Sequence, residues 1–233
     1  MANQLDLEEQ EQLAQIKHFW KQYGNTITWV MLGALAIWAG WTLYHDWQRR
    51  QATQAAALFD EVLRTVPSDD KGNQGDKNDK NNQGDRGNTA QVDRVFADMK
   101  DRFPSTTYAW QTGLMVAKHY FLAGKPEAAQ AALTWVAGQS SDPGYQAIAK
   151  LRLAAVLADK KDYAGALNQL SGTFPASFGA LVSDRRADVM FLQGDKAGAI
   201  DQYRKAYRLL DAHADYRRFI VAKLNALGVD LHD

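Results

Sequence analysis

The pattern of apolar and polar residues divides the chain into one uninterrupted apolar stretch and a series of amphipathic segments. The apolar stretch covers residues 27–44 and contains no charged side chain. A helix rises about 1.5 Å per residue, so this stretch would extend roughly 27 Å, close to the thickness of a bilayer's hydrocarbon core. Trp29 and Trp41 lie near its ends, where aromatic rings favour the headgroup region. A buried core helix would normally carry a polar face. We therefore predict a single transmembrane helix over residues 26–45.

The same segment is expected to remain in the protein as an uncleaved signal anchor. A secretory signal has a short basic start and a small-residue cleavage site, whereas here a long acidic lead precedes the stretch and bulky residues 45–50 follow it. Basic residues near the cytoplasmic end usually decide orientation. Lys17 and Lys21 stand on one side and Arg49 and Arg50 on the other, so charge alone leaves the orientation open.

Polar segments flank the predicted span. Residues 1–25 form a polar tail, and residues 46–66 continue as an amphipathic helix without Gly or Pro. Residues 67–88 contain no apolar side chain after Pro67, so they cannot offset the entropy cost of ordering, and we predict a disordered insertion. A calcium loop is disfavoured there, because Ala90 stands where the closing bidentate Glu is needed.

Residues 89–233 contain a repeated helical pattern and no convincing alternating strand pattern. Three alanines align at successive offsets of 37 and 33 residues, and each is followed by a turn residue, a second alanine and a large apolar residue at constant spacing. In chain order the three copies are Ala117, Gly124, Ala129 and Leu133; Ala154, Lys161, Ala166 and Leu170; and Ala187, Gly194, Ala199 and Tyr203. Ala206 extends the last copy with a further small residue.

This register predicts tetratricopeptide-like repeats, which are helix-turn-helix units of about 34 residues. Small alanines allow the two helices of a unit to approach closely, and Gly allows the chain to turn with positive φ. The middle copy departs from the pattern, because Lys161 replaces the turn glycine. The whole of residues 46–233 is predicted to be one all-α repeat domain, with an irregular first repeat and a capping helix at 216–227.

Composition narrows the possible functions. The chain has 233 residues with 27 basic and 27 acidic side chains, so its charge gives no reason to expect a nucleic-acid partner. It has no cysteine, which excludes disulfides and cysteine nucleophiles. The five histidines are scattered, and neither a phosphate-binding loop nor a nucleophile elbow is present. We therefore predict a protein that is not an enzyme and has no metal site or cofactor.

Two further groups of residues, one charged and one small, could contact a partner. Asp184, Arg185, Arg186 and Asp188 form a charged cluster that we expect to be a solvated face, with a partner contact as the alternative. Small residues on one face of the predicted span would let another membrane helix approach closely, with contact to lipid alone as the alternative. They are Gly33, Ala36 and Gly40.

Several short motifs resemble one known family. They are residues 9–17 with Phe19-Trp20, Phe103-Pro104 with Thr107-Tyr108-Ala109, the Ala117-Lys118 pair and the repeat signature. In this combination the chain resembles the YfgM-type ancillary subunits of the SecYEG translocon. The resemblance covers almost the whole chain except residues 67–88.

The resemblance implies a bacterial inner-membrane protein with a cytoplasmic tail (1–25), one span (26–45) and a periplasmic repeat domain (46–233). It implies a non-enzymatic scaffold that associates with SecYEG and links it to periplasmic chaperones, notably a PpiD-like chaperone, with unfolded translocating polypeptides as further partners. A periplasmic repeat adaptor in cell-envelope assembly is the alternative function.

Overall fold

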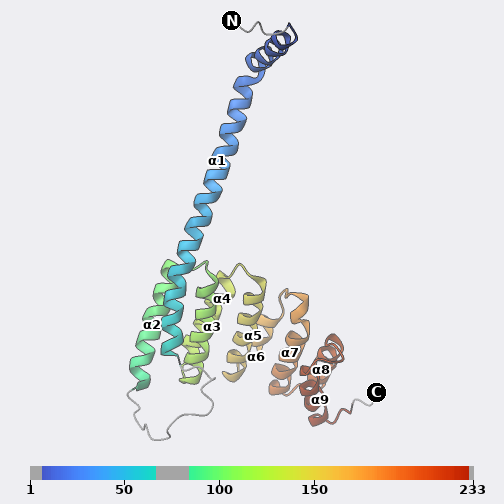
Figure 1. The fold of residues 1–233 in the computed structure, drawn as a ribbon. Helices are drawn as coiled ribbons and strands as arrows, with labels where there is room; N and C mark the ends of the chain where they lie inside the picture. Colours follow the sequence, from blue (N-terminus) through green and yellow to red (C-terminus); the bar gives the residue numbers. More distant parts are fainter. Residues whose placement is uncertain (1–6, 67–83, 231–233) are drawn as a thin grey trace. The chain divides into compact units, whose positions relative to one another are not determined.

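The computed structural model describes residues 7–66 and 84–230, and these residues are organised as helices (Figure 1). In chain order the elements are α1 (Leu7–Thr65), α2 (Gly84–Arg102), α3 (Thr107–Leu122), α4 (Pro126–Gln139), α5 (Pro143–Asp159), α6 (Tyr163–Leu170), the 3-10 helix η1 (Ala176–Phe178), α7 (Gly179–Gln193), α8 (Lys196–Leu209) and α9 (Tyr216–Ala226). Within the described ranges there is no strand, which confirms the all-α prediction for that part of the chain.

The chain divides into two compact units, Met1–Gln51 and Ala52–Asp233. In the first unit, α1 exposes most of its large apolar side chains between residues 29 and 44, including Trp29, Ile37 and Leu43 at 70%, 76% and 71% exposure. Among the residues that the structure describes, none of the helices combines the length and apolar character needed to cross a membrane. The span predicted for residues 26–45 is therefore not found as such.

Most of the predicted insertion cannot be compared with the structure. Residues 67–83, which include the first five positions of the disfavoured calcium loop at 79–90, lie outside the described residues. Helix α2 begins at Gly84, inside the range that the sequence assigns to the insertion. The amphipathic pattern of α2 places Val92, Val95 and Met99 in the core.

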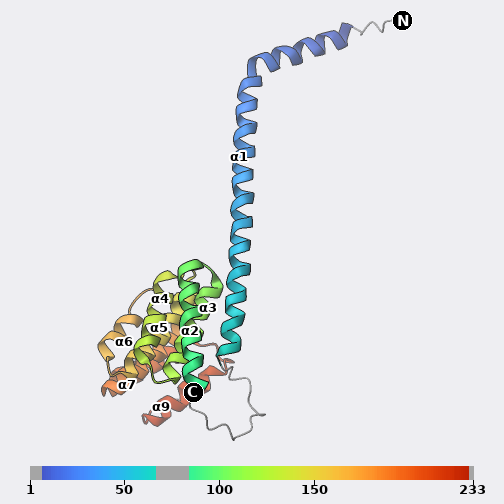
Figure 2. The ribbon, with the colours of Figure 1, turned by 90° about the vertical axis from the view of Figure 1, so that its left-hand side faces the viewer.

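The second unit is a stack of antiparallel helix pairs (Figures 1 and 2). Helix α3 packs on α4, α5 on α6 and α7 on α8, and each pair also contacts the next through α4·α5 and α6·α7. The first helices of neighbouring pairs touch as well, α3 with α5 and α5 with α7. Each unit thus buries its apolar face against its neighbours, as repeat proteins require.

The final helix closes the end of the stack. Ile220 and Leu224 of α9 are fully buried and share a core cluster with Ala187, Tyr203 and Ala206 of the last pair. A longer cluster runs from Val62 through the preceding pairs and ends at Val189 on α7. The capping role predicted for residues 216–227 matches this position of α9.

Side-chain caps mark the start of two second helices, α6 and α8, whereas α4 begins at Pro126 without a side-chain cap. Asp162 precedes α6 and accepts a hydrogen bond from the Gly165 backbone N–H, and Asp195 precedes α8 and accepts one from Gly198. These bonds satisfy amide groups that a helix N-terminus otherwise leaves free. The repeat boundaries are therefore encoded locally, before any packing between helices.

Candidate functional site

The repeat signature lies in the interior of the stack. Its alanines and large residues are all 4% exposed or less: Ala117, Ala129, Leu133, Ala154, Ala166, Leu170, Ala187, Ala199, Tyr203 and Ala206. In each pair the alanines of both helices belong to the same core cluster, where a larger side chain would hold the helices apart. These residues build the scaffold and are not available to a partner.

The turn between the two helices of each pair has the same backbone conformation in all three copies. Gly124 and Gly194 have φ of 70° and 95°, and Lys161 has φ of 64° at the equivalent position. A left-handed conformation costs a residue with a Cβ roughly 1–2 kcal/mol. The middle copy therefore keeps the turn geometry without the glycine that usually permits it, and Lys161 carries local backbone strain.

A pocket of about 230 Å³ lies between the first helices α5 and α7, and we name it the α5–α7 pocket. Four of its residues are apolar: Ile148 and Leu151 on α5, Phe178 in η1 and Leu181 on α7. Leu181 is 37% exposed, whereas its helix neighbour Val182 is buried at 7%. An apolar surface of this kind on neighbouring repeats is suited to the side chain of a bound polypeptide.

Two arginines border the apolar part of this pocket. Arg152 donates from Nη1 to the carbonyl oxygen of Leu114 at 3.2 Å, which ties it to the preceding repeat. Arg185 contacts Asp188 through Nη1 at 3.4 Å, while its buried Nε–H has no hydrogen-bond partner. A buried donor without an acceptor is costly.

The predicted solvated charge cluster on α7 is wrong for Asp184, which is only 2% exposed. Its two carboxylate oxygens accept from the Tyr216 hydroxyl at 2.6 Å and from Lys223 Nζ at 2.7 Å. Lys223 also donates to Asp188 at 2.7 Å, and Asp188 accepts from the Tyr203 hydroxyl at 2.6 Å. Since α9 supplies Tyr216 and Lys223, the acidic pair on α7 holds the capping helix.

This network changes the acidity of its tyrosines. Burial raises the pKa of Tyr203 above its ordinary value, and its hydrogen bond to Asp188 and the nearby negative charges act in the same direction. Burial likewise raises the pKa of Tyr216, together with its bond to Asp184. In a different place, burial and the hydrogen bond to Asp93 raise the pKa of Tyr120. These hydroxyls are therefore held as hydrogen-bond donors at neutral pH.

The small-residue face of α1 is exposed among the described residues. Gly33, Ala36 and Gly40 are exposed, and a Cβ added at either glycine would meet nothing within 4 Å. Close approach to another helix at this face remains a prediction.

Sequence reasoning missed the α5–α7 pocket and the partners of the acidic pair. Asp184 and Asp188 are four residues apart and share one face of α7, which is a usable signal, but Lys223 lies on a different helix. Leu151 and Leu181 occur within ordinary helical stripes and carry no motif. Among the described residues, no three His, Cys, Asp or Glu side chains are grouped closely enough to hold a metal ion.

Comparisons with known proteins agree with this architecture. The family described as tetratricopeptide repeat-like domain matches residues 17–229, which confirms the predicted repeats. Three curated relatives carry the name ancillary SecYEG translocon subunit. The protein from Neisseria gonorrhoeae is 27% identical over 95% of this chain and 98% of its own length.

The two other relatives show similar values. The protein from Haemophilus influenzae is 26% identical over 86% of this chain and 89% of its own length. The protein from Escherichia coli is 25% identical over 82% of this chain and 83% of its own length. The names agree with the resemblance seen in the sequence motifs, so that resemblance is confirmed.

Proposed function

Since the chain belongs to the tetratricopeptide repeat-like domain family, we propose that it is a non-enzymatic adaptor that associates with a SecYEG translocon. The observation that carries this proposal is the shared name of the three relatives, whose alignments extend along most of both chains. A stack of helical repeats supplies surfaces for binding proteins and needs no reactive group to do so. The proposed role is therefore contact between the translocon and other proteins.

The same proposal includes attachment to the inner membrane through α1. Support comes from the exposed apolar side chains between Trp29 and Tyr44, which would be unfavourable in water along a helix with no covering partner. Aromatic contacts gather at one end of this segment, where Trp41 lies against His45 and Tyr44 against Trp47. Such rings suit the boundary between lipid and water. Carbonate washing of membranes tests this point, because a protein held in lipid stays in the pellet.

The proposed topology has a cytoplasmic N-terminus and a periplasmic repeat domain. It rests on the resemblance, because the basic residues on the two sides of α1 are balanced. Alkaline phosphatase fused after Asp233 should be active if the repeat domain is periplasmic. Activity of β-galactosidase at the same position, with inactive phosphatase, would reverse the topology.

Within the repeat domain, the proposed binding surface is the α5–α7 pocket. An extended segment of a partner would place an apolar side chain against Leu151 and Leu181, with Arg185 in the lining of the same pocket. A periplasmic chaperone of the PpiD type and a translocating polypeptide are the proposed partners. A translocating polypeptide that has not yet folded exposes apolar side chains, which is the chemistry that this pocket accommodates.

Site-specific photocrosslinking in cells tests the proposal. A photoreactive residue at Leu181 should produce crosslinks to a chaperone or a translocating chain, and α1 should crosslink to the translocon. Thr134 is the control position, because it is exposed on the second helix α4 and lies outside the pocket. Crosslinks to cell-envelope assembly proteins in place of translocon components would support the alternative adaptor function.

A further inference from the structure

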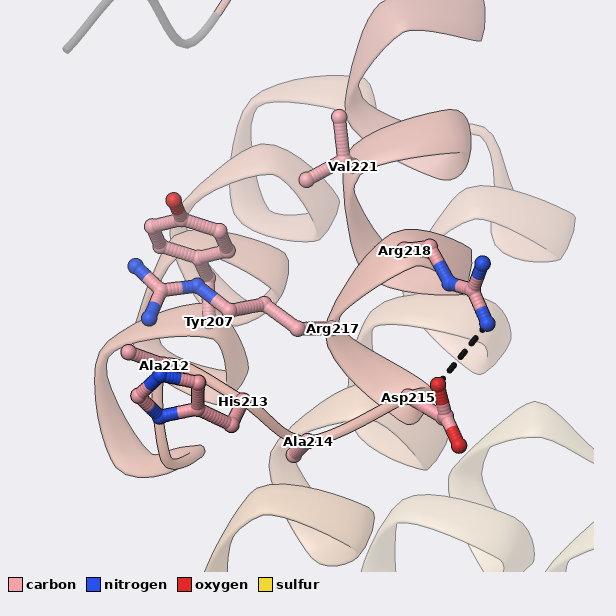
Figure 3. Close-up of a pocket in the computed structure, with 8 residues that line it drawn as sticks. All are labelled: Tyr207, Ala212, His213, Ala214, Asp215, Arg217, Arg218 and Val221. Carbon is pink, nitrogen blue, oxygen red and sulfur yellow. Dashed lines mark hydrogen bonds and ion pairs between the residues drawn. The ribbon is translucent and has the colours of Figure 1, made fainter.

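A second pocket, at the corner between α8 and α9, contains an arginine whose position suits a carboxylate ligand (Figure 3). The pocket has a volume of about 420 Å³. It is separate from the α5–α7 pocket, so conclusions about it do not depend on the proposed function. Its lining residues are Tyr207, Ala212, His213, Ala214, Asp215, Arg217, Arg218 and Val221.

Arg217 is stacked on an aromatic ring and has no acidic partner among the residues that the structure describes. Its guanidinium carbon lies 3.9 Å from the centre of the Tyr207 ring (Figure 3). Stacking fixes the plane of a guanidinium and leaves its N–H groups, which lie in that plane, free to bind a planar anion with two parallel hydrogen bonds. In the described part of the chain, no carboxylate lies within ion-pair distance of Arg217.

The helix that carries Arg217 is firmly held. The preceding residue, Tyr216, donates its hydroxyl to the buried Asp184 at 2.6 Å, and Ile220 one turn later is fully buried. The pocket also lies at the N-terminal end of α9, where the helix dipole favours a negative group. The Arg217 guanidinium is thus positioned in advance, which reduces the entropy lost on binding.

The balance of charge in the pocket selects the kind of anion. Arg218 is paired with Asp215 at 2.8 Å and His213 lies 3.4 Å from Asp211, so Arg217 is the one guanidinium in the lining without a carboxylate partner among the described residues. A carboxylate carries one negative charge, whereas a phosphate monoester carries about −1.5 to −2 at neutral pH. The Tyr207 ring and Val221 add apolar surface that can contact the methylene groups of an acidic side chain.

From this geometry we propose that the α8–α9 corner binds a carboxylate of an acidic polypeptide segment, with Arg217 as the group that binds the two oxygens. The occupant is a partner protein that presents Glu or Asp in an accessible segment. This site would add a charge-dependent contact at the C-terminal end of the repeat stack, on a surface that the α5–α7 pocket does not share.

The test uses the purified full chain in neutral detergent micelles at low salt. Binding of a fluorescein-labelled peptide, Gly-Ala-Glu-Ala-Glu-Ala-Gly with an amidated C-terminus, is followed by anisotropy and compared with the peptide in which Gln replaces Glu. We expect the Glu peptide to bind at least about tenfold more tightly, and Arg217→Gln to remove most of that difference. Arg217→Lys should also weaken binding, because it keeps the charge but loses the planar group.

The matched control is Arg208→Gln, which removes the same charge from an exposed position on α8 outside the pocket. An equal loss in Arg217→Gln and Arg208→Gln would overturn the proposal, because it would reflect overall charge. Equal affinity of the Glu and Gln peptides, or no binding of the Glu peptide, would also overturn it.

Competition with wild-type protein completes the test: stronger displacement of the Glu peptide by glycerol 3-phosphate than by N-acetylglutamate would assign the pocket to phosphate instead. Circular dichroism checks that each variant is folded.

Discussion

Lys223 on α9 donates to Asp184 on α7 with Nζ and Oδ1 2.7 Å apart, although 39 positions separate them in the chain. The Asp184 side chain is 3% exposed and that of Lys223 is 33% exposed, so a nearly buried carboxylate depends on a partly solvated ammonium. Together with the Tyr216 hydroxyl, this contact fixes the capping helix on the last repeat. Several measurements can test how far the end of the stack depends on it.

Lys223→Met should destabilise the repeat domain by about 2 kcal/mol, because a buried carboxylate loses its cation. Thermal unfolding followed by circular dichroism measures the change. Lys205→Met is the control, since that lysine is exposed on α8 and outside the network. In a double-mutant cycle, the variant that carries both Asp184→Asn and Lys223→Met should lose much less stability than the sum of the losses of the two single variants. Additive losses would show that the two side chains act independently.

Alkaline pH should weaken the fold through the tyrosine network. The folded-state pKa values of Tyr203 and Tyr216 are raised, so their contribution to stability is fully present below the ordinary tyrosine pKa of about 10 and is lost as pH rises above it. Each raised tyrosine adds up to about 1.4 kcal/mol per pH unit to this fall. Urea unfolding at pH values on both sides of 10 measures the slope. Tyr203→Phe should make the slope shallower than in the wild type, because it removes one of the tyrosines whose pKa is raised.

Lys161→Gly should stabilise the domain by about 1 kcal/mol, because Lys161 has φ of 64° and glycine adopts this conformation without steric cost. The reciprocal change, Gly194→Ala, should destabilise by a similar amount. A Cβ added at Gly194 would meet nothing within 4 Å, so only its φ of 95° opposes the change. Denaturant midpoints compare the two variants with the wild type. Shifts in the same direction would contradict the assignment of strain.

Gly113→Ala should destabilise the first complete repeat by roughly 1–3 kcal/mol. An added Cβ would overlap with Cγ2 of Val136 on α4, so the two helices could not keep their separation. Val136→Ala in the same chain should recover part of the loss. Gly138→Ala is the matched control, because a Cβ at that position meets nothing within 4 Å. Unfolding midpoints that are equal for the two glycine variants would exclude this close contact.

Leu181→Glu should reduce recovery of partners that use the α5–α7 pocket while leaving the domain folded. Leu181 is 37% exposed, so the charge is tolerated in the free protein but disfavoured against an apolar side chain. Leu122→Glu is the control, because Leu122 is 71% exposed at the end of α3 and lies outside the pocket. Quantitative co-purification from solubilised membranes compares the variants. Equal recovery from both would remove the α5–α7 pocket from the proposed function.

The helical class and the repeat register could be predicted from the sequence because they depend on short spacings. Alternation between small and large apolar residues marks the packed faces of α3 to α8, and Asp before a helix or Gly after it marks the boundaries. The sequence also shows that Lys161 replaces the turn glycine of the repeat pattern, but the left-handed conformation of Lys161 could not be predicted. Neighbouring helices fix that turn, and they override the preference of a single lysine.

The candidate sites depended on contacts between distant residues. Asp184 belongs to a run of charged residues that the sequence alone placed in solvent, and only the docking of α9 buries it beside Lys223 and Tyr216. Leu151 and Leu181 form a pocket because α5 and α7 pack against each other with an offset that no local motif specifies. The sequence by itself thus determined which residues form helices and which faces those helices bury. The tertiary structure decided which polar groups are paired and where surface remains open, because both depend on how helices approach across the repeats and not on spacing along one helix.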